Sequence, residues 1–343
     1  MVRVGDMTIS GDGDQQLRAD LVLEGGGVKG IALAGAVGRL VGAGYSFPRV
    51  AGTSAGAVVA AVLAALQAGG EPVDRLGDIA RTLDYGRFRD RGLPGRLLGP
   101  LGFLADGLSV LLEDGAYEGD YLHDWVAGVL GDLGVRTFGD LRTADPGDDG
   151  ALHHRYALVV TASDLSRRRL VQLPWDYPEY DLDPDEQPVA DAVRASASIP
   201  FFFEPVTLEG PAGVSTLVDG GLLSNYPISI FDRLDEVPPR WPTLGVRLDA
   251  LGIGRAPDRV SAVHGPLALG VALVQTSIEA CQAEHVLDRC NVARSMNVDT
   301  GEVGAVDFGL GEHAQGVLLT AGEAAADRFL ATWDFDRWLA DCR

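Results

Sequence analysis

The sequence predicts an α/β fold of the three-layer α/β/α type, built on a central and mostly parallel sheet. Short apolar runs alternate with longer helical patterns along most of the 343 residues, as expected when helices cover both faces of a sheet. The first two apolar runs each end in a glycine-rich turn that opens directly into a helix pattern. We find no internal repeat, coiled-coil heptad or low-complexity linker in the sequence, each of which would indicate another architecture.

The expected elements follow from these patterns. Strand-like runs cover residues 21–23, 49–51, 156–162, 170–173, 215–218 and 244–248. Helical patterns cover residues 31–41, 55–67, 122–130, 189–196, 266–285 and 323–330. Strands that alternate with helices favour crossover connections and hence parallel pairing.

The chain divides into three parts. Residues 1–20 form a polar N-terminal segment, and residues 21–248 form the main domain. Within that domain, residues 83–119 are apolar and interrupted by glycine and proline, which indicates an insertion. Residues 249–343 are expected to pack on the main domain or to extend it.

Composition excludes several classes of function. With 46% hydrophobic and 22% charged residues the chain is globular, and a net charge of −21 argues against nucleic acid and against simple adsorption to anionic lipid. The start lacks the pattern of a secretory signal, and the longest apolar stretch, residues 55–68, is too short to span a bilayer. The three cysteines suggest no disulfide framework. We therefore expect a cytoplasmic protein.

A glycine-rich loop follows the first apolar run. It reads Gly-Gly-Gly-Val-Lys-Gly over residues 25–30, and Lys29 is the sole lysine of the chain. Successive backbone N–H groups in such a loop can hold an anion.

The same loop fits the G-x-G-x-x-G fingerprint of dinucleotide-binding proteins. That fingerprint requires an acidic residue about 20 positions later to bind the ribose. Here the place holds residues 45–49, which end in Arg49 and contain no carboxylate. We therefore disfavour a nucleotide cofactor and expect no cofactor. No His/Cys/Asp cluster has the spacing of metal ligands, so we expect no metal either.

A second glycine turn contains a serine in the pattern G-x-S-x-G. Gly52, Ser54 and Gly56 lie between an apolar stub and an apolar helix pattern. Such a turn can be an ordinary helix start that Thr53 or Ser54 caps. The small residues and the strand–turn–helix context favour the nucleophile elbow, which exposes the serine hydroxyl at a helix N-terminus.

A nucleophilic serine needs a base. The six histidines, of which none lies in a convincing context, are His123, His153, His154, His264, His285 and His313. Asp219 is the better candidate, because it ends an apolar run and two glycines, Gly220 and Gly221, follow it. Asp-Gly-Gly alone is typical of a tight turn. A carboxylate that contacts the serine hydroxyl can nevertheless act as general base without an imidazole.

Taken together, these blocks resemble the patatin-like phospholipases. The loop at residues 25–30, the serine turn at 52–56 and Asp-Gly-Gly at 219–221 match the three signatures of that family in order. Residues 195–203, 137–141 and 162–165 also resemble the family, and the likeness covers about residues 21–248. Lys29 stands where the family often has arginine, and Gly221 where it also uses alanine.

The resemblance implies a patatin-like fold and hydrolysis of lipid acyl esters. It implies Ser54 as nucleophile, Asp219 as base and the N–H groups from Gly25 to Val28 as oxyanion hole. The motif residues that would support this site are Lys29, Gly30, Gly52, Gly56, Gly220 and Gly221. The implied substrate is a phospholipid at a membrane surface, so we expect the protein to attach peripherally to a membrane when active.

Other functions remain open at this point. The same site would serve a thioesterase or transacylase on soluble acyl chains, or a ligand-activated effector phospholipase. A lipid- or nucleotide-binding regulator with a vestigial site is disfavoured, because all the motif residues are present. An activator or a homo-oligomer is a further candidate partner, with residues from 251 onward as its contact region. Residues 93–104, which Arg87, Arg89 and Arg91 precede, form either a packed connector, which we favour, or a lipid-facing cap.

Overall fold

The computed structural model describes most of the chain. The described residues are 17–88, 119–143, 152–233, 235, 237–248, 263, 265, 269–278, 288–301, 303–305, 307 and 309–343. The apolar stretch 93–104, almost all of the expected insertion and most of the polar segment 1–20 lie outside them. Among the described residues, no helix combines the length and the apolarity that crossing a membrane would require.

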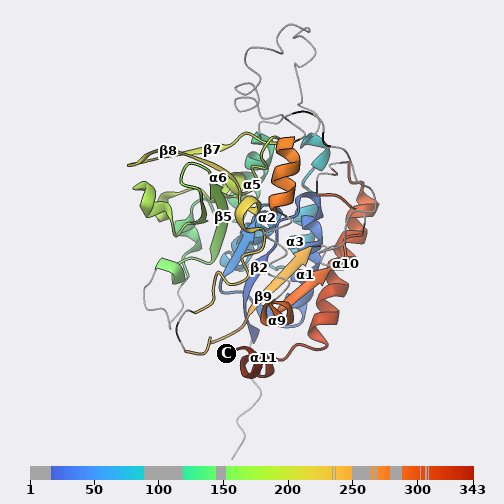
Figure 1. The fold of residues 1–343 in the computed structure, drawn as a ribbon. Coiled ribbons are helices and arrows are strands. Elements are labelled where there is room, and N and C mark those ends of the chain that lie inside the picture. The colour runs from blue at the N-terminus through green and yellow to red at the C-terminus, as the bar shows by residue number, and fades with distance from the viewer. Residues whose placement is uncertain are drawn as a thin grey trace, which may run out of the picture.

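A central sheet organises the described part of the chain, where eight strands pair with one another (Figure 1). In spatial order they are β10 (Ser295–Val298), β9 (Thr243–Leu248), β2 (Asp20–Leu23), β4 (Val50–Thr53), β5 (Leu158–Asp164), β8 (Gly213–Asp219) and β7 (Val206–Gly210), with β6 (Arg169–Leu173) also beside β5. From β10 to β5 the pairing is parallel, whereas β6, β7 and β8 pair antiparallel. The sheet is mostly parallel, as predicted.

Helices flank this sheet, which confirms the predicted α/β class (Figure 1). The helices are α1 (Ile31–Gly42), α2 (Ala55–Ala68), α3 (Arg75–Arg81), α5 (Asp120–Asp132), α6 (Val189–Ser196), α7 (Gly221–Ser224), α9 (Arg289–Ala293), α10 (Glu312–Leu330) and α11 (Phe335–Cys342), with a further helix over residues 269–278. Shorter 3-10 turns are η1 (Gly27–Gly30), η2 (Tyr85–Phe88), η4 (Phe138–Leu141), η5 (Leu152–His154), η6 (Tyr177–Tyr180) and η7 (Pro184–Glu186). A separate parallel pair joins β1 (Leu17–Arg18) to β3 (Tyr45–Ser46).

The core explains why the predicted strands form. Every residue of β2, β4, β5 and β9 is buried, as expected for strands that are covered on both faces. β7 and β10 have no counterpart among the predicted strands. β7 alternates between exposed and half-buried residues at the sheet edge, so its sequence lacks the apolar run that marks the others. β10 has only four residues and exposes Asn297.

The C-terminal residues add to the sheet and its cover. β10 pairs with β9 in parallel, and α10 packs along α1. Close approach between the two helices depends on small residues, because a Cβ at Gly322 would come within 1.9 Å of the Ala32 carbonyl oxygen. Residues 269–278 of the helix predicted at 266–285 are helical, and the rest of that range lies outside the described residues.

The expectation that the cysteines are unpaired is wrong for two of the three. Cys290 and Cys342 form a disulfide, with their Cα atoms 5.7 Å apart. These residues are 52 positions apart in the sequence, and folding brings α9 and α11 together around Trp338, whose Nε1 donates to the Cys290 carbonyl at 3.0 Å. Cysteine spacing carries no sign of such a long-range contact. Cys281 lies outside the described residues.

Candidate active site

Ser54 occupies a strained turn between β4 and α2. Its φ of 52° and ψ of −121° lie in a region that non-glycine residues rarely adopt, and such strain is typical of functional sites. The flanking glycines permit the turn, since a Cβ at Gly52 would come within 2.3 Å of the Gly56 carbonyl oxygen, and one at Gly56 within 2.2 Å of the Leu23 carbonyl oxygen. The Ser54 N–H donates to Ser196 Oγ at 2.8 Å. The turn therefore has the geometry of a nucleophile elbow.

The register of the sheet brings Asp219 to this turn. Thr53 lies opposite Thr161 on β5, and the next β5 residue, Ala162, lies opposite Asp219 on β8. Asp219 is therefore level with Ser54, whose side chain lies close enough to the Asp219 carboxyl to lower its pKa. The Gly221 N–H donates to Asp219 Oδ1 at 2.7 Å.

The carboxyl of Asp219 is buried without a compensating cation. Its residue is only 2% exposed, and none of the described lysine, arginine or histidine side chains forms an ion pair with it. Burial raises the pKa of this carboxyl from 3.8 to about 6, while hydrogen bonds from Ser54 and Gly221 act in the opposite direction. A carboxylate with a pKa near neutrality can accept and return a proton.

The glycine loop lies beside Ser54. Two of the four loop N–H groups considered above already donate hydrogen bonds to backbone carbonyls. The Gly25 N–H donates to the Asn225 carbonyl at 3.1 Å, and the Val28 N–H to the Ala305 carbonyl at 3.0 Å. Among the described residues, the N–H groups of Gly26 and Gly27 have no protein acceptor. Of the four N–H groups that the sequence suggested for binding an anion, only those of Gly26 and Gly27 are therefore left to do so among the described residues.

Two residues outside the predicted site fix this loop. Asn225 Nδ2 donates to the Gly25 carbonyl at 3.0 Å, so Asn225 holds both backbone polar groups of Gly25. The carbonyl of Ala305 lies against Gly27, whose φ is +57° and at which a Cβ would come within 1.9 Å of that oxygen. Gly27 therefore meets both a conformational and a steric demand.

The supporting motif residues lie at close contacts. Gly30 packs against Ala55 in α2, and Lys29 precedes Gly30 in η1. A Cβ at Gly220 would come within 2.5 Å of the Thr161 carbonyl oxygen, and one at Gly221 within 2.8 Å of Asn225 Oδ1. These glycines let the Asp219 turn approach β5 and the glycine loop.

None of the described histidines hydrogen-bonds to Ser54. His123 Nε2 contacts Asp191 Oδ1 at 2.9 Å, and the ring of His153 packs on Trp175. His264 and His285 lie outside the described residues. Likewise, within the described chain no group of three or more His, Cys, Asp or Glu side chains could hold a metal ion.

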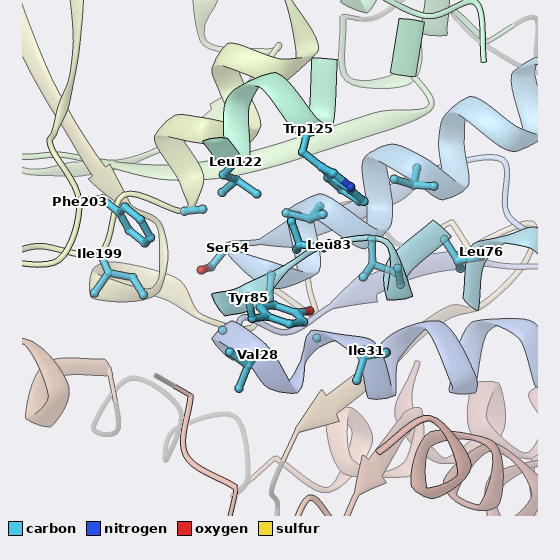
Figure 2. Close-up of a pocket in the computed structure, with 18 residues that line it drawn as sticks. Val28, Ile31, Ser54, Leu76, Leu83, Tyr85, Leu122, Trp125, Ile199 and Phe203 are labelled. Carbon is cyan, nitrogen blue, oxygen red and sulfur yellow. The ribbon is translucent and has the colours of Figure 1, made fainter. Parts of the chain in front are cut away.

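An apolar pocket opens at Ser54 (Figure 2). It contains about 720 Å³ of empty space, part of it open to solvent. Among the described residues that line it, none is charged. Of its polar groups, Trp125 Nε1 is bound to Thr82 Oγ1 at 3.1 Å. The apolar lining comes mainly from Val28, Ile31, Val58, Val59, Val62, Leu76, Leu83, Leu122, Ile199 and Phe203. Its lining is apolar enough to contact an aliphatic group beside Ser54.

Comparison with known proteins agrees with this geometry. The family model of the patatin-like phospholipases matches residues 21–232. The chain belongs to this family. Over 319 residues this patatin-like protein is 35% identical to the uncharacterized protein YqhO of Bacillus subtilis (strain 168), covering 92% of this chain and 99% of YqhO.

Two solved structures are also similar to this patatin-like protein. VipD from Legionella pneumophila has a TM-score of 0.47 and 17% identity, over 92% of this chain and 67% of the VipD chain. The ExoU–SpcU complex from the type III secretion system of Pseudomonas aeruginosa has a TM-score of 0.44 and 19% identity, over 92% of this chain. The patatin-like protein spans about half of that matched chain, 51%.

The sequence analysis did not identify three residues that bond to the serine turn or to the glycine loop. Ser196 and Asn225 are buried polar residues that bond to the serine turn and to the glycine loop, and Ala305 bonds to Val28. Ser196 lies in the family-like run 195–203, and Asn225 follows the Asp-Gly-Gly motif closely. Nothing in the sequence around Ala305 points to the glycine loop.

Proposed function

We propose that this protein hydrolyses lipid acyl esters with Ser54 as nucleophile and Asp219 as base. The observation that carries the proposal is the position of Ser54 beside the Asp219 carboxyl, which is buried and pairs with no cation among the described residues, at a pocket whose described lining is apolar. Membership of the patatin-like phospholipase family supports a lipid ester as the substrate.

The reaction has two steps. In the first, Ser54 Oγ attacks the ester carbonyl carbon while its proton passes to the Asp219 carboxylate, and the alcohol leaves with that proton. In the second, water attacks the acyl-serine and Asp219 takes the water proton, which passes to Ser54 Oγ as the bond to the acyl group breaks and the fatty acid is released. The N–H groups of Gly26 and Gly27 would stabilise the oxyanion in both steps. The N-terminus of the 14-residue helix α2 begins directly after Ser54 and favours the same negative charge.

The pocket supports one acyl chain as the buried part of the substrate. Because none of the described residues that line the pocket is charged, a phosphate head group would lose its hydration against them without gaining a partner. The head group would therefore remain outside. This arrangement suits a phospholipase A or lysophospholipase.

The decisive experiment measures fatty-acid release from mixed phospholipid vesicles. We expect Ser54→Ala and Asp219→Asn each to lower the rate by about 10³-fold or more, because both act as one nucleophile–base unit. His123→Ala serves as the control and should retain the wild-type rate, because its ring contacts Asp191 rather than Ser54. Wild-type turnover in Asp219→Asn would exclude the dyad.

The pocket also supports a second candidate, a thioesterase or transacylase on soluble acyl chains, because its lining does not distinguish an oxygen ester from a thioester. Release of fatty acid from acyl-coenzyme A, with none from phospholipid vesicles, would favour that candidate. Dependence of vesicle hydrolysis on an added activator, or on self-association of the chain, would identify a ligand-activated effector phospholipase. A cytoplasmic location, with peripheral membrane attachment when active, stays a prediction, although the Cys290–Cys342 disulfide removes the cysteine argument for a reducing compartment.

A further inference from the structure

Three uncharged segments meet beside the pocket. Residues 195–203, 220–231 and 269–278 contain no charged side chain, although 22% of the chain is charged. Ser277 Oγ donates to the Leu222 carbonyl at 3.0 Å, which joins the helix over 269–278 to α7. Gly270 lies against Phe201, because a Cβ there would come within 2.6 Å of the ring. Ile199 and Phe203 line the pocket, so residues 195–203 connect the pocket lining to the helix over residues 269–278.

We define the apolar rim as residues 199–203, α7 and the helix over residues 269–278. Its apolar side chains are unusually open to solvent: Leu273 is 62% exposed, Leu269 53% and Leu223 41%. Leu269 and Leu273 are one helical turn apart and lie on the same face of their helix. This helix is the orange one at the top of Figure 1. A contiguous exposed apolar surface next to a pocket is typical of an interaction site.

We propose that the apolar rim docks on an electrically neutral lipid surface. The chain carries a net charge of −21, so an anionic surface would repel it, whereas insertion of leucine side chains among lipid chains requires no charge. This inference rests on the proposed function. If an acyl chain fills the pocket, a rim in contact with lipid lets that chain pass from the surface to Ser54 without crossing water.

The test compares vesicle binding with hydrolysis of a soluble ester. Wild type, the double variant Leu269→Ser/Leu273→Ser and the single variant Leu223→Ser are sedimented with phosphatidylcholine vesicles. Val237→Ser is the matched control, because Val237 is also 53% exposed but precedes β9 and so lies at the opposite end of the sheet. Hydrolysis of a short monomeric p-nitrophenyl ester is measured on each variant in parallel.

We expect the double variant to bind vesicles about tenfold more weakly or worse, from the apolar area that each leucine buries. Leu223→Ser should show a smaller loss, and the control should bind as wild type does. Fatty-acid release from vesicles should fall with binding, while the soluble ester is hydrolysed equally by all four proteins. Binding of wild type should withstand about 0.5 M salt and should weaken when anionic lipid is added.

Three results would overturn the proposal: undiminished vesicle binding by the double variant, release of wild type from the vesicles by salt, or a wild-type dimer that the double variant turns into a monomer. The third result would assign the rim to a second copy of this chain. Failure of the proposed function gives a different pattern, because Ser54→Ala would then hydrolyse the soluble ester at the wild-type rate whatever the vesicle binding shows.

Discussion

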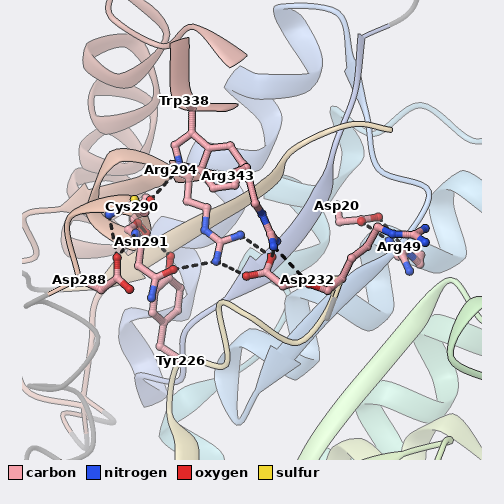
Figure 3. Close-up of polar contacts among 12 residues, drawn as sticks. Asp20, Arg49, Tyr226, Asp232, Asp288, Cys290, Asn291, Arg294, Trp338 and Arg343 are labelled. Carbon is pink, nitrogen blue, oxygen red and sulfur yellow. Dashed lines mark hydrogen bonds and ion pairs between the residues drawn. The ribbon is translucent and has the colours of Figure 1, made fainter. Parts of the chain in front are cut away.

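The two ends of the parallel sheet treat buried carboxyl groups in opposite ways. At the carboxyl ends of the strands, Asp219 contacts Ser54 and the Gly221 N–H and pairs with no cation among the described residues. At the amino ends, Asp20 begins β2 and forms an ion pair with Arg49, which directly precedes β4. Asp20 Oδ1 accepts from Arg49 Nε at 3.0 Å (Figure 3).

A second ion pair reinforces the amino end. Arg294, which precedes β10, donates to the two carboxylate oxygens of Asp232 at 2.6 and 2.7 Å and to Asn291 Oδ1 at 2.7 Å (Figure 3). Arg343 adds a contact to Asp232 at 3.8 Å. A bidentate arginine–carboxylate pair of this kind combines strength with a fixed geometry. The amino end is thus tied across strands that are distant in the sequence.

The two buried carboxyl groups differ in what opposes the cost of their burial. Burial raises the pKa of both Asp20 and Asp219, but Arg49 opposes the rise at Asp20, whereas only hydrogen bonds oppose it at Asp219. The pKa of Asp20 stays raised in spite of Arg49, so the ion pair offsets only part of the cost of burial. The carboxyl of Asp219 has no such cation among the described residues, and with a pKa of about 6 it can exchange a proton near neutral pH.

Substituting one carboxyl at each end gives the largest expected contrast. Asp219→Asn should lower the rate of acyl hydrolysis by about 10³-fold or more, whereas Asp20→Asn should leave the rate per folded molecule unchanged. Asp20→Asn should instead lower the free energy of unfolding by about 3–5 kcal/mol, because it leaves Arg49 without its buried partner. Hydrolysis rates and urea unfolding curves of the two variants test these expectations. Equal losses of rate in both variants would contradict the different roles assigned to Asp219 and Asp20.

The stability of Asp219→Asn should respond to pH in a defined direction. Because the pKa of folded Asp219 is raised from 3.8 to about 6, the folded state binds the proton more tightly, so wild-type stability falls as pH rises through this window. At pH 7 this rise in the pKa corresponds to a loss of about 3 kcal/mol in the free energy of unfolding. Asparagine does not ionise, so the variant should be more stable than wild type at pH 7 and should lose that advantage by about pH 4. Unfolding free energies at the two pH values measure this, and a variant less stable at pH 7 would contradict it.

A smaller contrast comes from two asparagines. Asn225→Ala removes the side-chain bond to the Gly25 carbonyl and frees the glycine loop, so we expect kcat to fall about 10- to 100-fold with little change in KM, because the oxyanion forms only in the transition state. Asn291→Ala removes a comparable bond to Arg294 at the amino end and should leave kcat unchanged. Each variant should lose about 1 kcal/mol of unfolding free energy. Steady-state kinetics of both variants therefore distinguish a positioning role of Asn225 from a mere loss of stability.

The smallest effect is that of pH on the rate. The proposed base must be ionised to accept the serine proton, so kcat/KM should fall about tenfold for each pH unit below about 6 and level off above it. A soluble ester avoids changes in vesicle charge during the titration. A profile without a transition between pH 5 and pH 7 would show that Asp219 is not the group that titrates.

Local patterns made the fold class predictable and suggested the candidate site residues. The glycine loop, the serine turn and Asp-Gly-Gly are each contiguous in the sequence, and each follows a strand or an apolar run, so their positions at strand ends could be expected. Their mutual geometry could not. It depends on the pairing of Ala162 with Asp219 and on the bonds from Asn225 and Ala305 to the glycine loop.

The ion pairs at the amino end of the sheet could not be predicted either, because they too depend on how distant parts of the chain are aligned. Asp20, Arg49, Asp232 and Arg294 are scattered along the chain and lie in no recognisable motif. Only the parallel alignment of β2, β4 and β10 in one sheet brings these residues to the same end. The Cys290–Cys342 disulfide likewise joins residues whose spacing gives no indication of contact.

The bond from Val28 to Ala305 has a consequence for synthesis on the ribosome. Domains begin to fold from the N-terminus while the chain is still being made, and Ser54 emerges long before residue 305. Until then the glycine loop lacks the carbonyl that lies against Gly27 and holds the Val28 N–H. An enzyme able to degrade lipid would thus remain incomplete on the ribosome, and its activity would be delayed until nearly the whole chain had been released.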